Sequence, residues 1–433
     1  MKKISLSPAG NAQSDIIIPI GGSKSYTNRA LIMASLARGT SIVRFPSTSA
    51  DSRVLIEALR MLGVSVNTRD DGSIKIAGNG GKFSERDIAI NVGHAGTAMR
   101  FLTALCALVP GKVVLDGSPR MRERPIGELV NALDQLGVHV EFKTNDGFPP
   151  LMVHGGAITK NIVTISGKVS SQFITSLLLI GPCIQGGLTI LIPDEQISGS
   201  YIDMTIDGMK QFGVTVINEK YRKYTVPSGS TYKSSEYAIE GDASGASYLF
   251  GIAALTKNKI TISNINPLSK QGDIHFVGIL EKMGCIVSRD ERKNEISVMG
   301  PDELKAATVD MSLMPDTAQT VAVIAAFAKG TTTITGLSTL KVKETDRLIA
   351  LKNELGKMGV PCSVTDDSIR IVGGGPHGAE IETYHDHRMA LAFAVAGAVI
   401  PGMEIDDPDV VIKSFPSYWE VLRTIGIGVV ELI

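Results

Sequence analysis

The sequence predicts a mixed α/β fold built from six copies of one unit. Three observations predict this fold. A helix that ends in glycine and leads into a short apolar strand recurs six times, at intervals of 67 to 76 residues. The chain has 433 residues, a length that suits two or three domains. Its composition, 43% hydrophobic and 20% charged, is typical of a compact protein and excludes a disordered one.

Each copy of the repeated helix ends at a position where a C-cap favours a glycine with positive φ. A polar turn and an alternating strand follow in five copies, as in SIKIAG at 73–78 and EISVMG at 295–300. Between these pieces lie a further strand, a short polar loop and a helix rich in Ala, Leu and Ile. Each unit therefore reads β-α-β-α-β-β. The six glycines are Gly63, Gly137, Gly213, Gly284, Gly359 and Gly426.

The sixth copy lacks its final strand, because the chain ends at residues 429–433. The N-terminal segment Lys3–Ser7 has the missing alternating pattern, so we expect it to complete the sixth unit. Such closure excludes an open solenoid. It favours two domains of three units each, 22–240 and 1–21 with 241–433, and a ligand cleft between them.

Polar residues gather in the loops that lead from a strand into a helix. Backbone N–H groups and the helix dipole at such positions favour phosphate or carboxylate. Taken singly, the first of these loops fits an ordinary N-cap as well as an anion site, and the other two fit an N-cap better. Three at the same position of the repeat, together with the cationic loop RMRER at 120–124, indicate an anion site. The three loops of the first half are GGSKS at 21–25, GHAGT at 93–97 and SSQ at 170–172.

The second half supplies acid and base groups. Asp316 opens a helix after Pro315, and the charged segment KVKETDR at 341–347 is too dense to be an ordinary surface turn. The sequence DHR at 386–388 starts an apolar helix. A metal site there is not expected, because adjacent residues at a helix start diverge and no HExxH motif or Cys partner accompanies them.

The charge balance argues against a nucleic-acid-binding protein, and the N-terminal sequence argues against a secreted one. The 43 Lys and Arg residues balance 44 Asp and Glu residues, a net charge of −1, which argues against general nucleic-acid binding. The first residues contain no apolar signal region, so we expect a cytoplasmic protein.

Nine motifs, in chain order and over essentially the whole chain, resemble those of the 5-enolpyruvylshikimate-3-phosphate synthase family. They are GGSKSYTNRA at 21–30, AGTAMR at 95–100, PRMRERPIG at 119–127, VSSQF at 169–173, EGDAS at 240–244, MPD at 314–316, KVKETDR at 341–347, DHRMA at 386–390 and KSFPSYW at 413–419. The resemblance implies an α/β (α+β) fold of two domains with three βαβαββ repeats each. This is the inside-out barrel or prism of the enolpyruvyl transferases.

The resemblance implies transfer of the enolpyruvyl group of phosphoenolpyruvate to the 5-hydroxyl of shikimate 3-phosphate. The products are 5-enolpyruvylshikimate 3-phosphate and phosphate, formed by addition and elimination in the shikimate pathway to chorismate and the aromatic amino acids. A monomer without metal or cofactor is implied. Because C3 is protonated as the hydroxyl attacks C2, an acid and a base must flank the substrates. By motif match the catalytic residues are Lys24, Asp316, Glu344 and His387.

The same resemblance implies which residues bind each substrate. Arginine dominates on the phosphoenolpyruvate side because a planar guanidinium binds carboxylate and phosphate in a bidentate manner. For phosphoenolpyruvate the residues are Lys24, Gly96, Arg124, Arg347, His387, Arg388 and Lys413. For shikimate 3-phosphate they are Ser25, Arg29, Ser170, Ser171, Gln172, Tyr201, Asp316, Thr339 and Lys343.

Four positions depart from the family pattern, and two alternative functions remain open. His94, Phe101, Thr339 and Lys341 stand where Asn, Pro, Asn and Arg are usual. The sister family, which transfers enolpyruvyl to UDP-N-acetylglucosamine, usually has a cysteine in the loop that corresponds to 120–124. This chain has no cysteine between residues 107 and 182, which disfavours that reading. The other alternative is a non-catalytic repeat protein that binds anionic metabolites, and phosphate release would separate it from an enzyme.

Overall fold

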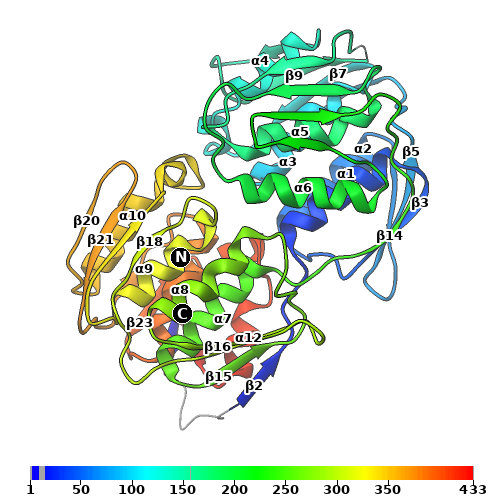
Figure 1. Cartoon of the computed structure of the whole chain (residues 1–433). Coiled ribbons are helices and arrows are strands. Elements are labelled where there is room, and N and C mark those ends of the chain that lie inside the picture. The colour runs from blue at the N-terminus through cyan, green and yellow to red at the C-terminus, as the bar shows by residue number, and fades with distance from the viewer. Residues whose placement is uncertain (1, 9–14, 157, 433) are drawn as a thin grey trace. The chain divides into compact units, whose positions relative to one another are not determined.

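The chain divides into two compact units. The computed structural model describes residues 2–8, 15–156 and 158–432. Residues Gly22–Ile239 form one unit, called here the N-terminal unit. Residues Met1–Gly21 and Glu240–Ile433 form the other, the C-terminal unit. The chain passes between the two units near Gly21 and again near Glu240 (Figure 1).

The described residues of the N-terminal unit form three four-stranded sheets. The strands are β3 (Arg38–Arg44), β4 (Ser65–Thr68), β5 (Ile74–Asn79), β6 (Arg86–Asn91), β7 (Gly111–Asp116), β8 (His139–Phe142), β9 (Leu151–Gly155), β10 (Ile162–Thr164), β11 (Leu188–Leu191), β12 (Ile217–Glu219), β13 (Lys223–Val226) and β14 (Glu236–Ala238). Their orders are β14-β3-β5-β4, β6-β7-β9-β8 and β10-β11-β13-β12. In each sheet the first two strands are parallel and the remaining neighbours are antiparallel.

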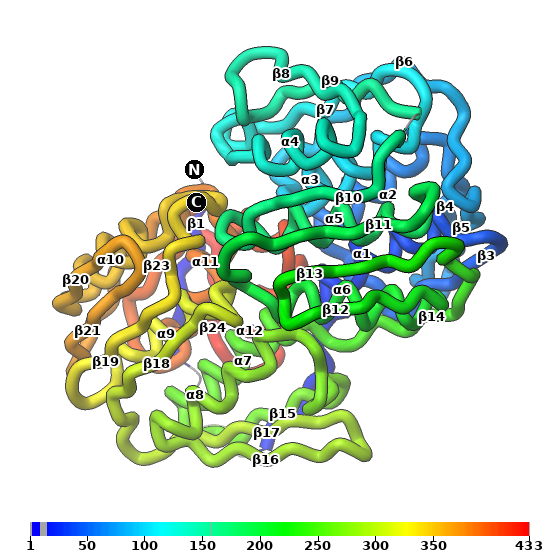
Figure 2. Tube along the Cα trace, turned by 45° about the horizontal axis from the view of Figure 1, so that its top comes forward, coloured from blue at the N-terminus to red at the C-terminus, as the bar shows by residue number. Residues whose placement is uncertain are grey.

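Three more four-stranded sheets lie in the described part of the C-terminal unit. Their strands are β1 (Lys3–Ser7), β2 (Asp15–Ile18), β15 (Lys259–Ile262), β16 (Ile286–Asp290), β17 (Glu295–Met299), β18 (Thr308–Asp310), β19 (Gly330–Thr335), β20 (Cys362–Val364), β21 (Ile369–Gly373), β22 (Glu380–Ile381), β23 (Met403–Asp406) and β24 (Gly428–Leu432). Their orders are β16-β17-β15-β2, β18-β19-β21-β20 and β22-β23-β1-β24. Figure 2 shows β15, β17 and β16 running side by side.

The N-terminal strand completes the last repeat, as the sequence pattern predicts. Strand β1 lies between β23 and β24 and is antiparallel to both, with Ile4 opposite Ile405 on one side and Glu431 on the other. Ile4 and Leu6 are buried, which is the alternation expected of a strand with one face on a core. The prediction that the chain closes on itself is confirmed.

The two chain crossings exchange strands between the sheets of the two units. Strand β2 precedes the first helix of the N-terminal unit, yet it pairs in parallel with β15, Ile16 facing Ile260. Strand β14 precedes the first helix of the C-terminal unit, yet it pairs in parallel with β3, Tyr237 facing Val43. The order β-α-β-α-β-β is therefore correct along the chain. At each crossing, however, the leading strand belongs to the sheet of the other unit.

The helices of the N-terminal unit lie inside it and the sheets lie outside. Helices α1 (Lys24–Leu36), α3 (Gly96–Cys106) and α5 (Ser171–Ile180) pack against one another and are buried on nearly all sides. Helices α2 (Ala50–Met61), α4 (Gly127–Gln135) and α6 (Gly199–Gln211) each pack against two of these. Figure 1 shows β7 and β9 covering α3, and β3 and β5 beside α1. A helix that is buried on nearly all sides needs neighbours on every face, and this enclosed position supplies them.

The C-terminal unit repeats the arrangement. Its inner helices are α7 (Ala243–Thr256), α9 (Ala318–Ala325) and α11 (His387–Ala394), and α9 packs against the other two. Its other helices are α8 (Phe276–Lys282), α10 (Arg347–Lys357) and α12 (Tyr418–Thr424). The short 3-10 helices are η1 (Met121–Glu123) and η2 (Gly181–Cys183) in the N-terminal unit, and η3 (Gly272–His275), η4 (Pro315–Thr317), η5 (Ser338–Val342), η6 (Ala396–Ala398) and η7 (Pro408–Lys413) in the C-terminal unit. No described helix has the length and apolar character needed to cross a membrane.

The repeated glycines end their helices with the predicted backbone conformation. All six have positive φ, from 76° at Gly359 to 102° at Gly284. An L-residue with a β-carbon is strained in this region, whereas glycine is not. The helix ends that define the repeat are confirmed.

Candidate active site

The three predicted anion loops of the N-terminal unit each open an inner helix. Lys24 is the first residue of α1, Gly96 is the first residue of α3, and Ser170 is the N-cap of α5. The Gln172 amide nitrogen lies 3.5 Å from the Thr97 hydroxyl, so the starts of α3 and α5 are neighbours. Helix N-termini that converge in this way concentrate positive potential and free N–H groups, which suits an anionic ligand.

Lys24 is held by a carboxylate that the sequence pattern does not reveal. Its ammonium group lies 3.1 Å from a carboxylate oxygen of Asp51, and both side chains are largely buried. Asp51 lies in the first turn of α2, where an acidic residue is expected for its interaction with the helix dipole alone. A partner 27 residues away leaves no local signal, so the pairing emerges only from the fold.

Gly96 and Arg124, both predicted to bind phosphoenolpyruvate, touch each other. Arg124 follows η1 and is buried, and a β-carbon built on Gly96 would lie 2.5 Å from its Nη1 atom. The guanidinium therefore packs on the bare face of the glycine at the start of α3. Arg100 fixes the segment by donating to the backbone oxygens of Gly96, at 3.3 Å, and Pro125, at 3.0 Å.

Arg29 links two other residues predicted for shikimate 3-phosphate, Ser25 and Tyr201. It is buried in α1 and donates to the Ser25 carbonyl at 2.9 Å, the Tyr201 carbonyl at 3.0 Å and the Thr205 hydroxyl at 2.8 Å. Burial lowers the pKa of Arg29 to about 10. No carboxylate among the described residues bonds to this guanidinium, so a bound anion would offset the cost of its burial.

In the C-terminal unit one buried arginine joins three carboxylates. Arg347, the first residue of α10, is only 1% exposed. Its Nε lies 2.7 Å from Asp386, its Nη2 lies 2.9 Å from Glu344, and its Nη1 lies 3.5 Å from Asp316. Charges buried so deeply are stable only when paired, so Arg347 fixes the positions of both predicted catalytic carboxylates, Asp316 and Glu344.

Further cations complete this cluster. Arg388 donates to Asp316 at 2.7 Å, Lys343 lies 3.6 Å from the other oxygen of Asp316, and Lys413 lies 2.5 Å from Glu344. Burial acts to raise the pKa of Asp316, but the charges of Arg388, Lys343 and Arg347 outweigh it and hold this pKa well below its usual range. Asp316 is therefore ionised at neutral pH and can accept a hydrogen bond from a hydroxyl.

His387 and His385 point to different surroundings, as expected for residues at a helix start. His387 is buried at the beginning of α11, with Nδ1 3.4 Å from Asp386, whereas His385 is exposed and bonds Asp407 at 2.9 Å. Asp386 caps α11 by accepting from the Arg388 backbone N–H at 2.9 Å, and it also binds Arg347. Its role as a cap was visible in the sequence, whereas its role as an ion-pair partner was not.

The 3-10 helix η5 contains two of the positions that depart from the family pattern, Thr339 and Lys341. The buried Thr339 hydroxyl has no hydrogen-bond partner among the residues that the structure describes, which leaves it available to a ligand. Lys341 instead pairs with Asp366, an exposed residue between β20 and β21. Lys343, two residues further on, forms an ion pair with Asp316.

A buried carboxyl that the sequence did not single out adjoins the cluster. Asp273 in η3 is 5% exposed and accepts a hydrogen bond from the Ser244 hydroxyl on α7. Its other oxygen has no hydrogen-bond partner among the described residues. Burial, reinforced by the charge of Asp316, raises the pKa of Asp273 to about 7. The charge of Asp273 therefore changes near neutral pH.

Asp273 should make the stability of the C-terminal unit fall as pH rises. Its folded pKa of about 7 lies above the usual 3.8, so the folded state retains a proton between these values that the unfolded state loses. The unfolding free energy should fall across this window by on the order of a few kcal/mol. Asp273→Asn should lack this contribution. Urea unfolding at pH 5 and pH 8, followed by Trp419 fluorescence, reports the unit directly because Trp419 is the only tryptophan of the chain.

Asp302→Asn is the matched control, because Asp302 is a fully exposed carboxylate of the same unit. It should follow the wild type at both pH values. If the difference between wild type and Asp273→Asn is the same at pH 5 and pH 8, Asp273 does not titrate in this range.

The fold and the site define an α/β repeat protein whose inner-helix starts carry lysines, arginines and paired carboxylates suited to small anions. Residues 9–422 match the family described as EPSP synthase (3-phosphoshikimate 1-carboxyvinyltransferase). The chain belongs to the EPSP synthase family.

Relatives and solved structures agree with this assignment. The 3-phosphoshikimate 1-carboxyvinyltransferase of Colwellia psychrerythraea is 41% identical over 98% of this chain and 100% of its own length. That of Nitrosomonas europaea is 40% identical over 98% of this chain and 99% of its own length. The EPSP synthase of Acinetobacter baumannii has a solved structure with a TM-score of 0.83 and 25% identity, covering 100% of both chains. The predicted fold class is confirmed.

Proposed function

We propose that this chain transfers the enolpyruvyl group of phosphoenolpyruvate to the 5-hydroxyl of shikimate 3-phosphate and releases phosphate. Family membership supports the reaction. The observation that carries it is the cluster in which Arg347, Arg388 and Lys413 bind the carboxylates of Asp316 and Glu344. A reaction that joins two anionic substrates needs cations to offset their charge. It also needs acids and bases to move the protons.

Each carboxylate suits a different part of the reaction. Asp316, held ionised by its cations, is suited to orient the attacking hydroxyl and accept its proton. Glu344, bonded to Lys413, is suited to exchange a proton with C3 of the enolpyruvyl group. Lys24, fixed by Asp51, is suited to exchange a proton with the bridging oxygen that leaves with phosphate. His387 is suited to contact phosphoenolpyruvate.

The substrate contacts in this proposal are mainly charged and hydroxyl groups. Phosphoenolpyruvate contacts Lys24, Gly96, Arg124, Arg347, His387, Arg388 and Lys413. Shikimate 3-phosphate contacts Ser25, Arg29, Ser170, Ser171, Gln172, Tyr201, Asp316, Thr339 and Lys343. Catalysis as a monomer in the cytoplasm remains a prediction.

Phosphate release tests the proposal directly. Release should require both substrates together and should continue in EDTA, because lysines and arginines supply the charge neutralisation that a metal would otherwise provide. Loss of release in EDTA that a divalent metal restores would contradict the metal-free reaction. UDP-N-acetylglucosamine in place of shikimate 3-phosphate should give no release. Release with that substrate would favour the sister activity, and no release with either would favour a binding protein.

Gly96→Ala should weaken phosphoenolpyruvate binding while preserving the fold. The new β-carbon would meet the Arg124 guanidinium at 2.5 Å, and this flexible end of the side chain must move away. Displacing a charged hydrogen-bond donor should raise the KM for phosphoenolpyruvate by about tenfold to a hundredfold. The dissociation constant of shikimate 3-phosphate, measured by calorimetry without the second substrate, should change little.

Gly356→Ala provides the control, because Gly356 lies on the exposed side of α10 with no atom within 4 Å of an added β-carbon. It should leave both constants unchanged. An unchanged KM in Gly96→Ala would mean that Arg124 does not bind phosphoenolpyruvate.

A further inference from the structure

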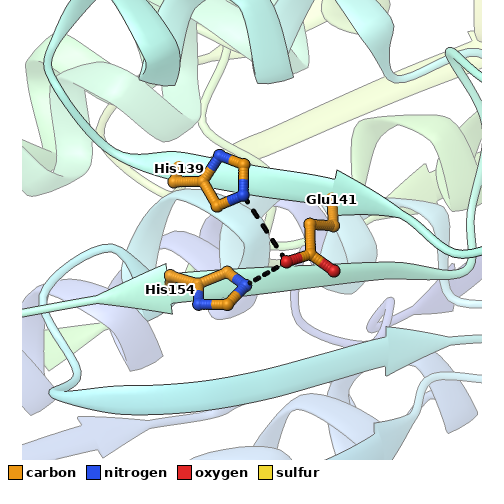
Figure 3. Close-up of side chains that lie close together, drawn as sticks. All are labelled: His139, Glu141 and His154. Carbon is orange, nitrogen blue, oxygen red and sulfur yellow. Dashed lines mark hydrogen bonds and ion pairs between the residues drawn. The ribbon is translucent and has the colours of Figure 1, made fainter.

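Two histidines and a glutamate converge on one face of a sheet in the N-terminal unit. His139 and Glu141 lie on β8, and His154 lies on β9. The same carboxylate oxygen of Glu141 lies 2.8 Å from Nε2 of His154 and 3.5 Å from Nε2 of His139 (Figure 3). The centroids of the two imidazole rings are 4.9 Å apart. One ligand atom from each residue falls within 4.8 Å of the other two.

The strand register causes this convergence. His139 and His154 are directly opposite on the antiparallel pair β8 and β9. Glu141 is two residues along β8 from His139, so its side chain emerges on the same face. Leu151 and Val153 alternate with His154 and are buried against the core, which leaves the three polar side chains on the opposite face. Positions on paired strands are held more precisely than positions on a loop.

The three donor atoms match the preferences of a zinc-type ion. Imidazole nitrogen and carboxylate oxygen bind Zn²⁺ at about 2.0–2.2 Å, which places tetrahedral ligand atoms about 3.3 Å apart. The distances of 2.8 and 3.5 Å from the Glu141 oxygen to the two nitrogens lie on either side of that value. A small rotation of the side chains would suffice to hold an ion. All three side chains are partly exposed, so an ion and its waters can reach them.

We propose that His139, Glu141 and His154 bind one divalent transition-metal ion of the zinc type, with water in the remaining position. None of the residues assigned to enolpyruvyl transfer belongs to this triad. The ion replaces the hydrogen bonds between imidazole and carboxylate, and each histidine then carries its proton on Nδ1. Because the triad shares no residue with those assigned to enolpyruvyl transfer, we expect the reaction to proceed without the ion.

Binding of the ion should stabilise the pairing of β8 with β9 at the edge of the sheet. Among the described strands, β8 pairs with β9 alone, so an ion bound by both strands adds a second link across that pair. The loop between them reaches the start of α4, where the Gly147 carbonyl accepts from the N–H groups of Ile126 and Gly127 at 2.9 and 3.1 Å. An ion bound by the folded protein but not by the unfolded chain raises the midpoint of thermal unfolding.

Lys143 opposes the ion. Its ammonium group lies 3.7 Å from the second carboxylate oxygen of Glu141, and a cation there repels a metal ion bound to that carboxylate. Lys143→Gln should therefore bind the ion more tightly than the wild type. Unchanged or weaker binding in this variant would place the ion away from the Glu141 carboxylate and contradict the site.

Calorimetric titration with Zn²⁺ tests the proposal on the full chain, after treatment with EDTA and removal of the chelator. The wild type should bind one ion at this site. His139→Gln, Glu141→Gln and His154→Gln should each weaken binding at least about tenfold, because even outer-shell partners of a metal site contribute that much. The double variant His139→Gln/His154→Gln should lose the site, together with the Zn²⁺-dependent rise in the unfolding midpoint. Mg²⁺ should not compete, since it prefers six oxygen ligands.

His385→Gln is the matched control. His385 also bonds a carboxylate, Asp407 at 2.9 Å, but no third metal-ligating residue joins this pair among the described residues. Its Zn²⁺ affinity should equal that of the wild type. The unfolding midpoint without metal and the enzymatic rate of the double variant should match those of the wild type, which shows that the variant folds. If the wild type binds Zn²⁺ no more tightly than a correctly folded double variant, the triad is only a hydrogen-bonded surface cluster.

Discussion

Replacement of Glu344 by glutamine should lower kcat by about 10²–10⁴-fold, the usual contribution of a general acid or base. Glutamine preserves the shape of the side chain and its hydrogen bond from Arg347, which lies 2.9 Å away, but it cannot exchange a proton. The proton transfer occurs only once phosphoenolpyruvate is bound. Calorimetric binding of shikimate 3-phosphate alone should therefore change little.

Glu344 has a second conceivable role, because it also holds Lys413 at 2.5 Å. If its task were only to position Lys413 and Arg347 for the substrate, Glu344→Gln would raise the KM for phosphoenolpyruvate and leave kcat at saturation nearly intact. The division of the effect between kcat and KM thus decides between proton transfer and positioning. A loss confined to KM would contradict the proton-transfer role.

Glu281→Gln is the control for this experiment. Glu281 lies on α8 and, like Glu344, accepts hydrogen bonds from an arginine, Arg289, at 2.8 and 2.9 Å. It is about 41% exposed and belongs to no proposed substrate contact. Its replacement should leave both kcat and KM at wild-type values.

The repeat could be predicted because its signals are local. A glycine that ends a helix must adopt positive φ, and the alternation of Lys3–Ser7 matches the strand missing from the sixth copy. The expected boundaries already assign residues 15–18 to the second half and residues 236–238 to the first, but the strands with which β2 and β14 pair could not be predicted from their patterns. Both are short strands before a polar loop, and either sheet offers the same kind of parallel neighbour. Only the packing of the whole unit selects the partner.

The candidate site likewise has features that could be predicted from local sequence and contacts that could not. Helix starts at Lys24, Gly96 and Asp386 were predictable, because capping residues and polar loops act over a few residues. The contacts of Lys24 with Asp51 and of Arg347 with Asp386 join residues 27 and 39 positions apart, and no periodicity encodes them. The metal-binding triad was missed for the same reason. His139 and His154 meet through strand register alone.

Arg347→Met should destabilise the C-terminal unit by about 3–5 kcal/mol, the cost of removing one partner from a buried ion pair. Methionine fills much of the volume but leaves Asp386, Glu344 and Asp316 without their shared cation. Asp386 is fully buried and would suffer most. Urea unfolding followed by Trp419 fluorescence measures this unit separately, and enzymatic activity should be lost even where the variant remains folded, because Arg347 is also a proposed phosphoenolpyruvate contact.

Arg289→Met is the control that tests whether the loss of stability in Arg347→Met comes from the burial of its ion pairs. Arg289 binds Glu281 through two hydrogen bonds, but its side chain is 37% exposed, and an exposed pair contributes only about 0–1 kcal/mol. Its loss should therefore be hard to detect in the same unfolding experiment. Arg347 helps to hold the pKa of Asp316 well below its usual range, so the penalty in Arg347→Met should also shrink at acid pH, where protonation of Asp316 removes its orphaned charge. An equal, pH-independent loss in both variants would show that side-chain packing, and not the buried charge cluster, holds the site together.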